Sequence, residues 1–429
     1  MATGTSTQET RLDRIGVPHP LRWGFLGVLV FMTGHGVESN FVSPHVEAVV
    51  GSQNTAGTIL TAYGVAVIVG SYLSGALSDL WGPRRVMLLG FAVWVVFQAA
   101  FLASLAAGST ALIAASYFFR GFGYPLFAFA FLVWINAIVP SSRNGKAVGW
   151  FYVMFTGGLP TLGSLYAVFA IPAFGGGFDG ETGAMVSSSV LVLAGFLITR
   201  FGVREPTGRG RLAPPGESAG GVLLAGLRLT VRRPKILAGF LVRLINTSPQ
   251  YGMFIILPVV IADQLGYGQS RWLLMTVCVY AGNILVNAVF GAVGDAIGWA
   301  RTVRWFGIVG SAVGLLAWWY VPQWVPNSDW GYVASVAAGV FFGVMLAGFV
   351  PMGAIMPHLA PDHAGAAMAM YTTAAGGAAF SGAAVVALVQ ALGGSNAAVV
   401  WAFVGLYAVA FVLVGFLRVP EDERGARHH

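Results

Sequence analysis

The chain has 429 residues, of which 57% are hydrophobic and only 9% are charged. A soluble globular domain carries about 25% charged residues, so this composition excludes an ordinary water-soluble fold and indicates an all-α membrane protein. The net charge of +7 does not indicate nucleic-acid binding, because the basic residues lie in short gaps between apolar runs rather than on one soluble face.

Apolar segments long enough to cross a bilayer recur along the chain and predict twelve transmembrane helices in two pseudo-symmetric six-helix bundles. The expected order is an N-terminal tail at 1–21, a bundle at 22–201, a flexible, solvated linker at 202–235, a second bundle at 236–418 and a C-terminal tail at 419–429. The predicted helices are 22–50, 56–79, 85–107, 110–138, 145–172, 183–201, 236–262, 270–297, 302–321, 331–357, 365–391 and 396–418.

The distribution of basic residues predicts the orientation in the membrane. Twenty of the 23 lysines and arginines fall in the tails, the linker and the loops on the same side as these segments, whereas only Arg271 falls on the opposite side. By the positive-inside rule, both termini and the linker should be cytoplasmic in a multi-pass protein of the plasma or inner membrane. The remaining two basic residues, Arg120 and Arg243, lie within predicted helices.

Two loops carry copies of one motif, Gly-Ala-Leu-Ser-Asp-Leu-Trp-Gly-Pro-Arg-Arg at 75–85 and Gly-Ala-Val-Gly-Asp-Ala-Ile-Gly-Trp-Ala-Arg at 291–301. Each copy places an aspartate at a helix end, a glycine that permits a tight turn, and arginine just beyond. The carboxylate can pair with arginine or face the N-terminus of a neighbouring helix. We expect a conformational latch, or gate, built from Asp79, Arg84, Arg85, Asp295 and Arg301.

This motif resembles the loop signature of the major facilitator superfamily, and the resemblance covers the whole chain. Segments 34–44, 120–135 and 147–163 are similar to helices 1, 4 and 5 of the ribitol and arabinitol permeases. The resemblance implies a proton-linked uptake carrier for a linear sugar alcohol. One departure is His35, at a position where such permeases are expected to carry an acidic residue, and it argues against a coupling scheme with two carboxylates.

Charged residues within the predicted helices are candidates for proton coupling, because an unpaired charge in the membrane interior costs several kcal/mol. Glu38 lies about 24 Å into helix 1 and Arg120 about 16 Å from the outer end of helix 4, so the two could meet in a central cavity. Protonation of Glu38 would then release Arg120. His35 shares the helix face of Glu38 and can change charge near neutral pH. The alternatives are a static ion pair and a structural histidine.

Polar residues on helices 7 and 8 are candidates for substrate binding, because amides both donate and accept hydrogen bonds. Arg243 shares one face of helix 7 with two of them, and we interpret it as a gate residue or one that reaches toward the interface. The alternative for the amides is hydrogen bonding between helices. The full predicted substrate set is His35, Glu38, Asn40, Arg120, Tyr124, Asn246, Gln250, Tyr251, Asn283 and Asn287.

No pattern in the sequence indicates an enzyme. A phosphate-binding Gly-Lys-Ser/Thr loop is missing, and Cys278 is the single cysteine, so we expect neither a cofactor nor a metal site. The expected partners are a small-molecule substrate, protons and the lipid bilayer, for a monomer that does not bind nucleic acid. The favoured function is proton-coupled uptake of a sugar alcohol by alternating access.

Three alternative functions remain open from the sequence. Two intramembrane arginines against one intramembrane glutamate leave spare positive charge, which would suit a small organic anion or a sugar acid. Aromatic-rich helices would suit a drug/proton antiporter, although Gly-Gly-Leu-Pro at 157–160 departs from the pattern of that class. A non-transporting sensor on a transporter fold is the third alternative, and the retained motif in both halves argues against it.

Overall fold

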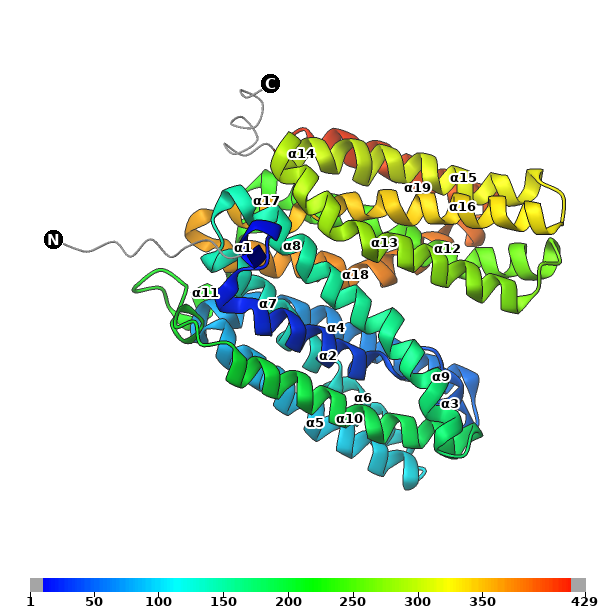
Figure 1. Ribbon diagram of the computed structural model, residues 1–429, viewed down its shortest axis with the longest axis horizontal. Coiled ribbons are helices and arrows are strands. Elements are labelled where there is room, and N and C mark those ends of the chain that lie inside the picture. Colours follow the sequence, from blue (N-terminus) through cyan, green and yellow to red (C-terminus); the bar gives the residue numbers. More distant parts are fainter. Residues whose placement is uncertain (1–10, 418–429) are drawn as a thin grey trace.

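The computed structural model describes residues 11–417, which fold into two helical bundles joined by a linker. The bundles lie close together at one end and diverge toward the other (Figure 1). The linker, residues 203–233, lies at the end where they converge, and we call this the linker end and the opposite one the far end. The predicted all-α fold is confirmed.

The helices that form the crossings are often divided into shorter pieces. The N-terminal bundle contains α2 (Arg22–Gly36), α3 (Val42–Val50), α4 (Gln53–Trp81), α5 (Pro83–Ala106), α6 (Thr110–Arg120), α7 (Gly123–Ile138), α8 (Ser141–Thr156), η2 (Gly157–Leu162), α9 (Gly163–Ala173) and α10 (Gly177–Gly202). The C-terminal bundle contains α12 (Pro234–Leu257), η4 (Pro258–Gln264), α13 (Gln269–Ile297), α14 (Trp299–Thr302), η5 (Val303–Gly310), α15 (Ser311–Trp324), α16 (Asp329–Leu346), η6 (Ala347–Phe349), α17 (Met352–Leu359), η7 (Pro361–His363), α18 (Ala364–Ala391) and α19 (Asn396–Val414).

Eleven helical segments of the described chain are long and apolar enough to cross a membrane. The predicted first crossing, 22–50, is not one continuous helix, because it is broken between Gly36 and Val42 into α2 and α3. Gly36 lies against η2 so closely that a Cβ atom there would be 1.9 Å from the carbonyl oxygen of Leu159. The break places Glu38 in a turn rather than inside a regular helix.

The linker is more ordered than the sequence suggested. It contains the short η3 (Thr207–Arg209) and the 14-residue helix α11 (Ala219–Arg232), so the prediction of a flexible, solvated connection missed a helix. The backbone N–H groups of Leu212 and Ala213 both donate to the carbonyl oxygen of Asp79, at 2.9 and 3.0 Å. The linker is thereby attached to the end of α4.

The predicted tails are described only in part. Within the N-terminal tail, α1 (Arg11–Ile15) and η1 (His19–Leu21) precede α2, and the indole N–H of Trp150 donates to the carbonyl oxygen of Ile15 at 2.8 Å. Residues 1–10 and the predicted C-terminal tail, 419–429, lie outside the described residues, as does Arg418 at the end of the last predicted helix.

Candidate functional site

Glu38 and Arg120 form a buried ion pair inside the N-terminal bundle. The guanidinium bonds both carboxylate oxygens, through Nη1 to Oε2 at 2.8 Å and through Nη2 to Oε1. Arg120 is fully buried and Glu38 is 7% exposed, so neither charge is left to bulk solvent. Two-pronged pairing of this kind offsets much of the cost of burying both charges. The expected contact between Glu38 and Arg120 is present, but it lies inside one bundle and not in a cavity between the two.

Polar side chains that the sequence analysis did not single out complete this ion pair. The Tyr117 hydroxyl donates to Glu38 Oε1 at 3.0 Å, and the amide oxygen of Gln98 accepts from Arg120 Nη1. Gln98 also donates to the carbonyl oxygen of Met185 on α10, at 3.2 Å. The cluster therefore connects the turn after α2 with α5, α6 and α10, all within one bundle.

His35 is held one turn before Glu38 by aromatic neighbours. The indole N–H of Trp94 donates to His35 Nδ1 at 3.0 Å, and the Tyr63 hydroxyl lies 3.2 Å from Nε2. With Nδ1 accepting, a neutral imidazole carries its proton on Nε2 and donates it to Tyr63. The imidazole also stacks on the half-buried ring of Tyr124, with 4.5 Å between ring centroids. His35 and Tyr124, both predicted site residues, are thus in direct contact.

Arg243 is a buried cation at the seam between the bundles. It is 4% exposed, donates to the hydroxyl of Thr247, and places its guanidinium carbon 3.9 Å from the ring centroid of Phe349 and 5.4 Å from that of Tyr371. Tyr371 in turn shares a hydrogen bond of 2.7 Å with the hydroxyl of Tyr152 from the other bundle. Ring faces attract a cation but do not neutralise it.

The charge of Arg243 has no acidic partner among the described side chains, because none of the ion pairs in residues 11–417 includes it. Its Nε atom also lacks a hydrogen-bond partner within this part of the chain. A guanidinium has five N–H donors in a planar fork that suits a carboxylate. The Nε atom of Arg120 is unpaired as well, but the charge of Arg120 is balanced by Glu38, whereas that of Arg243 is not.

The predicted amides of helices 7 and 8 mostly join helices to one another. Asn246 Nδ2 donates to a backbone carbonyl of η5 at 2.6 Å, and Asn283 Nδ2 donates to one of α16 at 2.8 Å. Asn287 is fully buried and reaches across the seam to Thr156 Oγ1, at 3.4 Å. These contacts match the alternative of interhelical hydrogen bonding, most clearly for Asn246 and Asn283.

The remaining predicted substrate residues lie apart from the ion pair. Asn40 is exposed and donates from Nδ2 to Ser164 Oγ at 2.6 Å. Gln250 is half-buried and Tyr251 is exposed, and both lie about two turns beyond Arg243 on α12. Gln250 and Tyr251 therefore lie beyond Arg243 toward the far end of α12, whereas Asn40 belongs to a separate contact.

The second copy of the loop motif holds a carboxylate against the start of a helix from the other bundle. Asp295 at the end of α13 accepts hydrogen bonds from the backbone N–H groups of Gly145 and Lys146 on α8, at 3.0 and 2.9 Å. The indole N–H of Trp299 donates to the same side chain at 2.8 Å. A negative charge at a helix N-terminus is favourable because the helix dipole is positive there.

The first copy has the same arrangement with the bundles exchanged. Asp79 at the end of α4 lies against the start of α18, where a Cβ atom on Gly365 would be 1.9 Å from Asp79 Oδ1. The motif glycines, Gly82 and Gly298, have φ angles of 83° and 104°, which favour glycine over residues with a side chain. The tight turns predicted from the motif are confirmed.

The arginines of the motif do not pair with these aspartates. Arg84 donates to the carbonyl oxygen of Arg200 at 2.8 Å, within its own bundle, and Arg85 and Arg301 are exposed. Of the two contacts expected for the motif carboxylates, the structure shows the one with a helix N-terminus. Each bundle therefore contributes one carboxylate and one helix start to the closed linker end.

Comparison with known proteins identifies the family. The family model described as Major Facilitator Superfamily matches residues 24–383. This chain belongs to the Major Facilitator Superfamily. An alpha-ketoglutarate permease of Bacillus subtilis (strain 168) is 36% identical over 96% of this chain and 92% of its own. A D-arabinitol transporter of Klebsiella pneumoniae is 33% identical over 95% of this chain and 94% of its own.

The fold of this facilitator is also similar to that of solved structures. A proton:xylose symporter of the superfamily superimposes with a TM-score of 0.71 at 16% identity, covering 97% of this chain and 98% of that one. Because proteins of this family move small molecules across membranes and are not enzymes, the expectation of a non-enzymatic transporter is confirmed.

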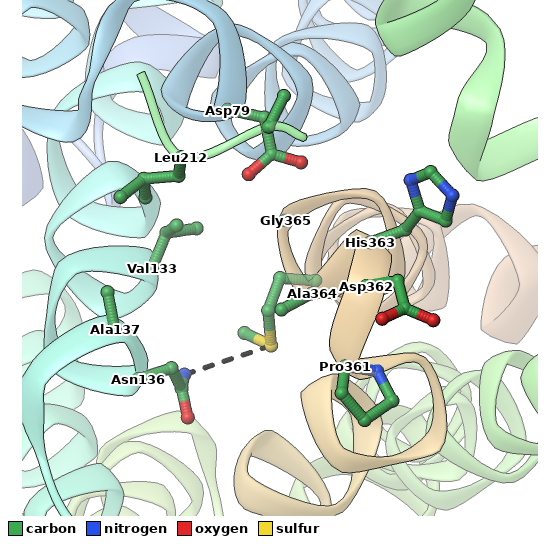
Figure 2. A pocket seen from close by; sticks show the side chains of 12 residues that line it. Asp79, Val133, Asn136, Ala137, Leu212, Pro361, Asp362, His363, Ala364 and Gly365 are labelled. Atoms are coloured by element: carbon green, nitrogen blue, oxygen red, sulfur yellow. Dashed lines mark hydrogen bonds between the residues drawn. The ribbon is translucent and has the colours of Figure 1, made fainter. Parts of the chain in front are cut away.

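The facilitator has a cavity of about 180 Å³ at the linker end, on the seam between the bundles (Figure 2). Asp79 and Asn136 reach it from the N-terminal bundle, and Gly365 and Met368 from α18. A dashed line in Figure 2 marks the one drawn contact of Asn136, whose amide nitrogen lies 3.8 Å from the sulfur of Met368. Leu212 of the linker lines one wall of this cavity. The two bundles are therefore not in contact along the whole seam at the linker end, and the linker covers part of the gap.

Several residues of these sites had weak sequence signals. Gln98 is an isolated polar residue in an apolar helix, which was a usable signal for a buried hydrogen-bonding role. Tyr152 and Tyr371 were hidden among many aromatic residues, most of which face lipid or pack in the core. Nothing in a single sequence indicates that two tyrosines 219 positions apart share a hydrogen bond.

Proposed function

We propose that this facilitator takes up a small organic acid together with protons, with its linker end in the cytoplasm. The observation that carries the proposal is Arg243, a buried arginine at the seam whose charge no described acidic side chain balances. A carboxylate of the substrate would supply the missing negative charge. The distribution of basic residues supports the orientation, because the linker and the loops beside it carry most of them.

The neighbours of Arg243 suggest how binding would be linked to movement. The guanidinium rests on Phe349 and Tyr371, and Tyr371 is hydrogen-bonded across the seam to Tyr152. A bound carboxylate would compete with these ring faces for the guanidinium and weaken its hold on Tyr371. The cross-bundle bond would then be easier to break, and the linker end could open to release the substrate.

Glu38 is the proposed proton carrier. Its carboxylate is balanced by Arg120 alone among the described basic side chains, so protonation would leave Arg120 as an unpaired cation inside the bundle. The cost of that state favours a conformation in which solvent or substrate reaches Arg120. This coupling is consistent with alternating access, in which two bundles rock about a site between them.

A relative described as an alpha-ketoglutarate permease, 36% identical to this chain, supports an organic acid as substrate. A sugar alcohol is the second candidate, because a D-arabinitol transporter is 33% identical and α12 offers neutral polar groups beyond Arg243 at the half-buried Gln250 and the exposed Tyr251. The sequence alone favoured the sugar alcohol. Arg243 reverses this order, because a neutral polyol would leave its buried charge unbalanced.

The test is ligand-induced thermal stabilisation of the purified transporter. A panel of dicarboxylates, sugar acids and pentitols is compared, since a ligand at 100 times its Kd stabilises the folded state by about 2.7 kcal/mol. We expect acids to stabilise the wild type and Arg243→Gln to weaken their binding roughly 10- to 100-fold, the loss of one charge-assisted hydrogen-bonding group.

Arg304→Gln is the matched control, because Arg304 is a half-buried arginine of the same bundle that lies 4.3 Å from the ring of Phe411. Its replacement should leave acid binding unchanged. Stabilisation of the wild type by pentitols and not by acids would overturn the organic-acid proposal in favour of the sugar alcohol.

A further inference from the structure

The linker helix α11 has two apolar faces, and only one of them is covered by protein. The covered face consists of Val222, Ala225, Gly226 and Leu229. The other consists of Leu224, Leu227 and Val231, which are 56%, 52% and 86% exposed. At 100° per residue these two sets point in opposite directions from the helix axis. The protein alone therefore accounts for only half of the apolar surface of α11.

The covered face packs on the side of two crossing helices, one from each bundle. The Tyr72 hydroxyl of α4 donates to the carbonyl oxygen of Leu223 at 2.6 Å. A Cβ atom on Gly226 would lie 2.9 Å from the ring of Tyr72 and 3.2 Å from the carbonyl oxygen of Ala366 on α18. Tyr72 precedes the last residue of α4, Trp81, by nine positions, or about 14 Å along the helix. Thus α11 lies beside the crossing helices and not beyond their ends.

The charges on α11 and directly after it are all positive, although Glu217 precedes the helix. The helix contains Arg228 and Arg232 and no acidic residue, and Arg233 and Lys235 follow directly. Arg228 and Arg232 are both exposed and lie along one edge of the uncovered apolar face. A helix with an apolar face bordered by arginines is typical of segments that lie in the interface of a membrane with anionic lipids.

We propose that α11 is a lipid-binding strap, which inserts Leu224, Leu227 and Val231 into the leaflet at the linker end and places Arg228 and Arg232 among anionic phospholipid headgroups. The occupant of the uncovered face is the bilayer surface itself. Because the opposite face bridges α4 and α18, binding to the leaflet holds these two helices together across the seam. Anionic lipid therefore favours the conformation in which the linker end is closed.

The experiment places an environment-sensitive fluorophore on α11 in the full-length transporter. Cys278 is replaced by serine, and a single cysteine is introduced by Leu227→Cys or, as the matched control in the same linker, by Arg209→Cys, because both positions are exposed. The labelled proteins are reconstituted into vesicles of phosphatidylcholine alone or mixed with phosphatidylglycerol. Quenching by lipids that carry a nitroxide on the acyl chain is then compared with quenching by aqueous iodide.

We expect the label at 227 to be quenched by the lipid nitroxide several-fold more than the label at 209, and the difference to grow when phosphatidylglycerol is present. Arg228→Gln with Arg232→Gln should remove the dependence on phosphatidylglycerol while the label remains partly shielded. Equal iodide quenching at 227 and 209 would overturn the proposal. Shielding of the 227 label from both quenchers would also overturn it, because that result indicates a protein partner on this face.

Discussion

The reciprocal aspartate contacts at the linker end lead to a prediction about the balance between closed and open states. Asp295→Asn keeps the side-chain volume but replaces one acceptor oxygen by an NH₂ group that faces backbone N–H donors. One charge-assisted hydrogen bond is worth about 1.5–3 kcal/mol and the interaction with the helix dipole about 0.3–1 kcal/mol. The closed state should therefore lose about 2–4 kcal/mol, which shifts the open-to-closed ratio roughly 30- to 700-fold.

The distance between spin labels across the linker end measures this shift. Ser142 on α8 and Asp362 at the start of η7 are exposed and belong to opposite bundles, so they are suitable label positions in a background without Cys278. Asp295→Asn and Asp79→Asn should each move the distance distribution toward longer values. By contrast, Trp299→Phe removes a hydrogen bond within one bundle and should leave the distance distribution unchanged. Unchanged distributions in both aspartate variants would refute the idea that these contacts keep the linker end closed.

Two further predictions concern coupling and orientation. Glu38→Gln imitates the protonated carboxyl next to Arg120, so it should abolish uptake driven by a proton gradient while preserving exchange of substrate between loaded compartments. If this variant still accumulates substrate against a concentration gradient, Glu38 is excluded as the proton carrier. A cysteine introduced at Ser142 in intact cells should react with membrane-permeant thiol reagents at least about tenfold faster than with impermeant ones, because the linker end is expected to face the cytoplasm. Equal labelling by the two reagents would contradict that orientation.

Helix periodicity and charge spacing were sufficient to predict the bundles and the pair formed by Glu38 and Arg120. Length and hydropathy fix where a chain can cross a bilayer, and an isolated acid and base in apolar helices have few other partners. The break at 37–41 could not be predicted in this way, because it depends on how closely α2 approaches η2 at Gly36.

The roles of the helix 7 and helix 8 amides could not be predicted from the sequence either. Asn246 and Asn283 have the spacing of a polar face, yet both donate to backbone carbonyls of neighbouring helices. Which carbonyls are left available depends on local departures from α-helical geometry, such as the π-helical segment η5, that no hydropathy pattern encodes. Linker helix α11 was missed for a different reason, because its 14 residues are too few to cross a bilayer and two consecutive prolines precede it.

All described members of the Glu38 cluster belong to one bundle, whereas Arg243 sits where the two bundles meet. A rigid rotation of one bundle against the other preserves every distance inside each of them, so it cannot by itself sense whether Glu38 carries a proton. A run of side-chain contacts does join the two places, through His35, Tyr124, Phe155, Tyr152 and Tyr371. Protonation of Glu38 would be coupled to the seam through displacements of these contacting side chains. Such steric coupling, unlike electrostatic coupling through solvent, is not screened by salt.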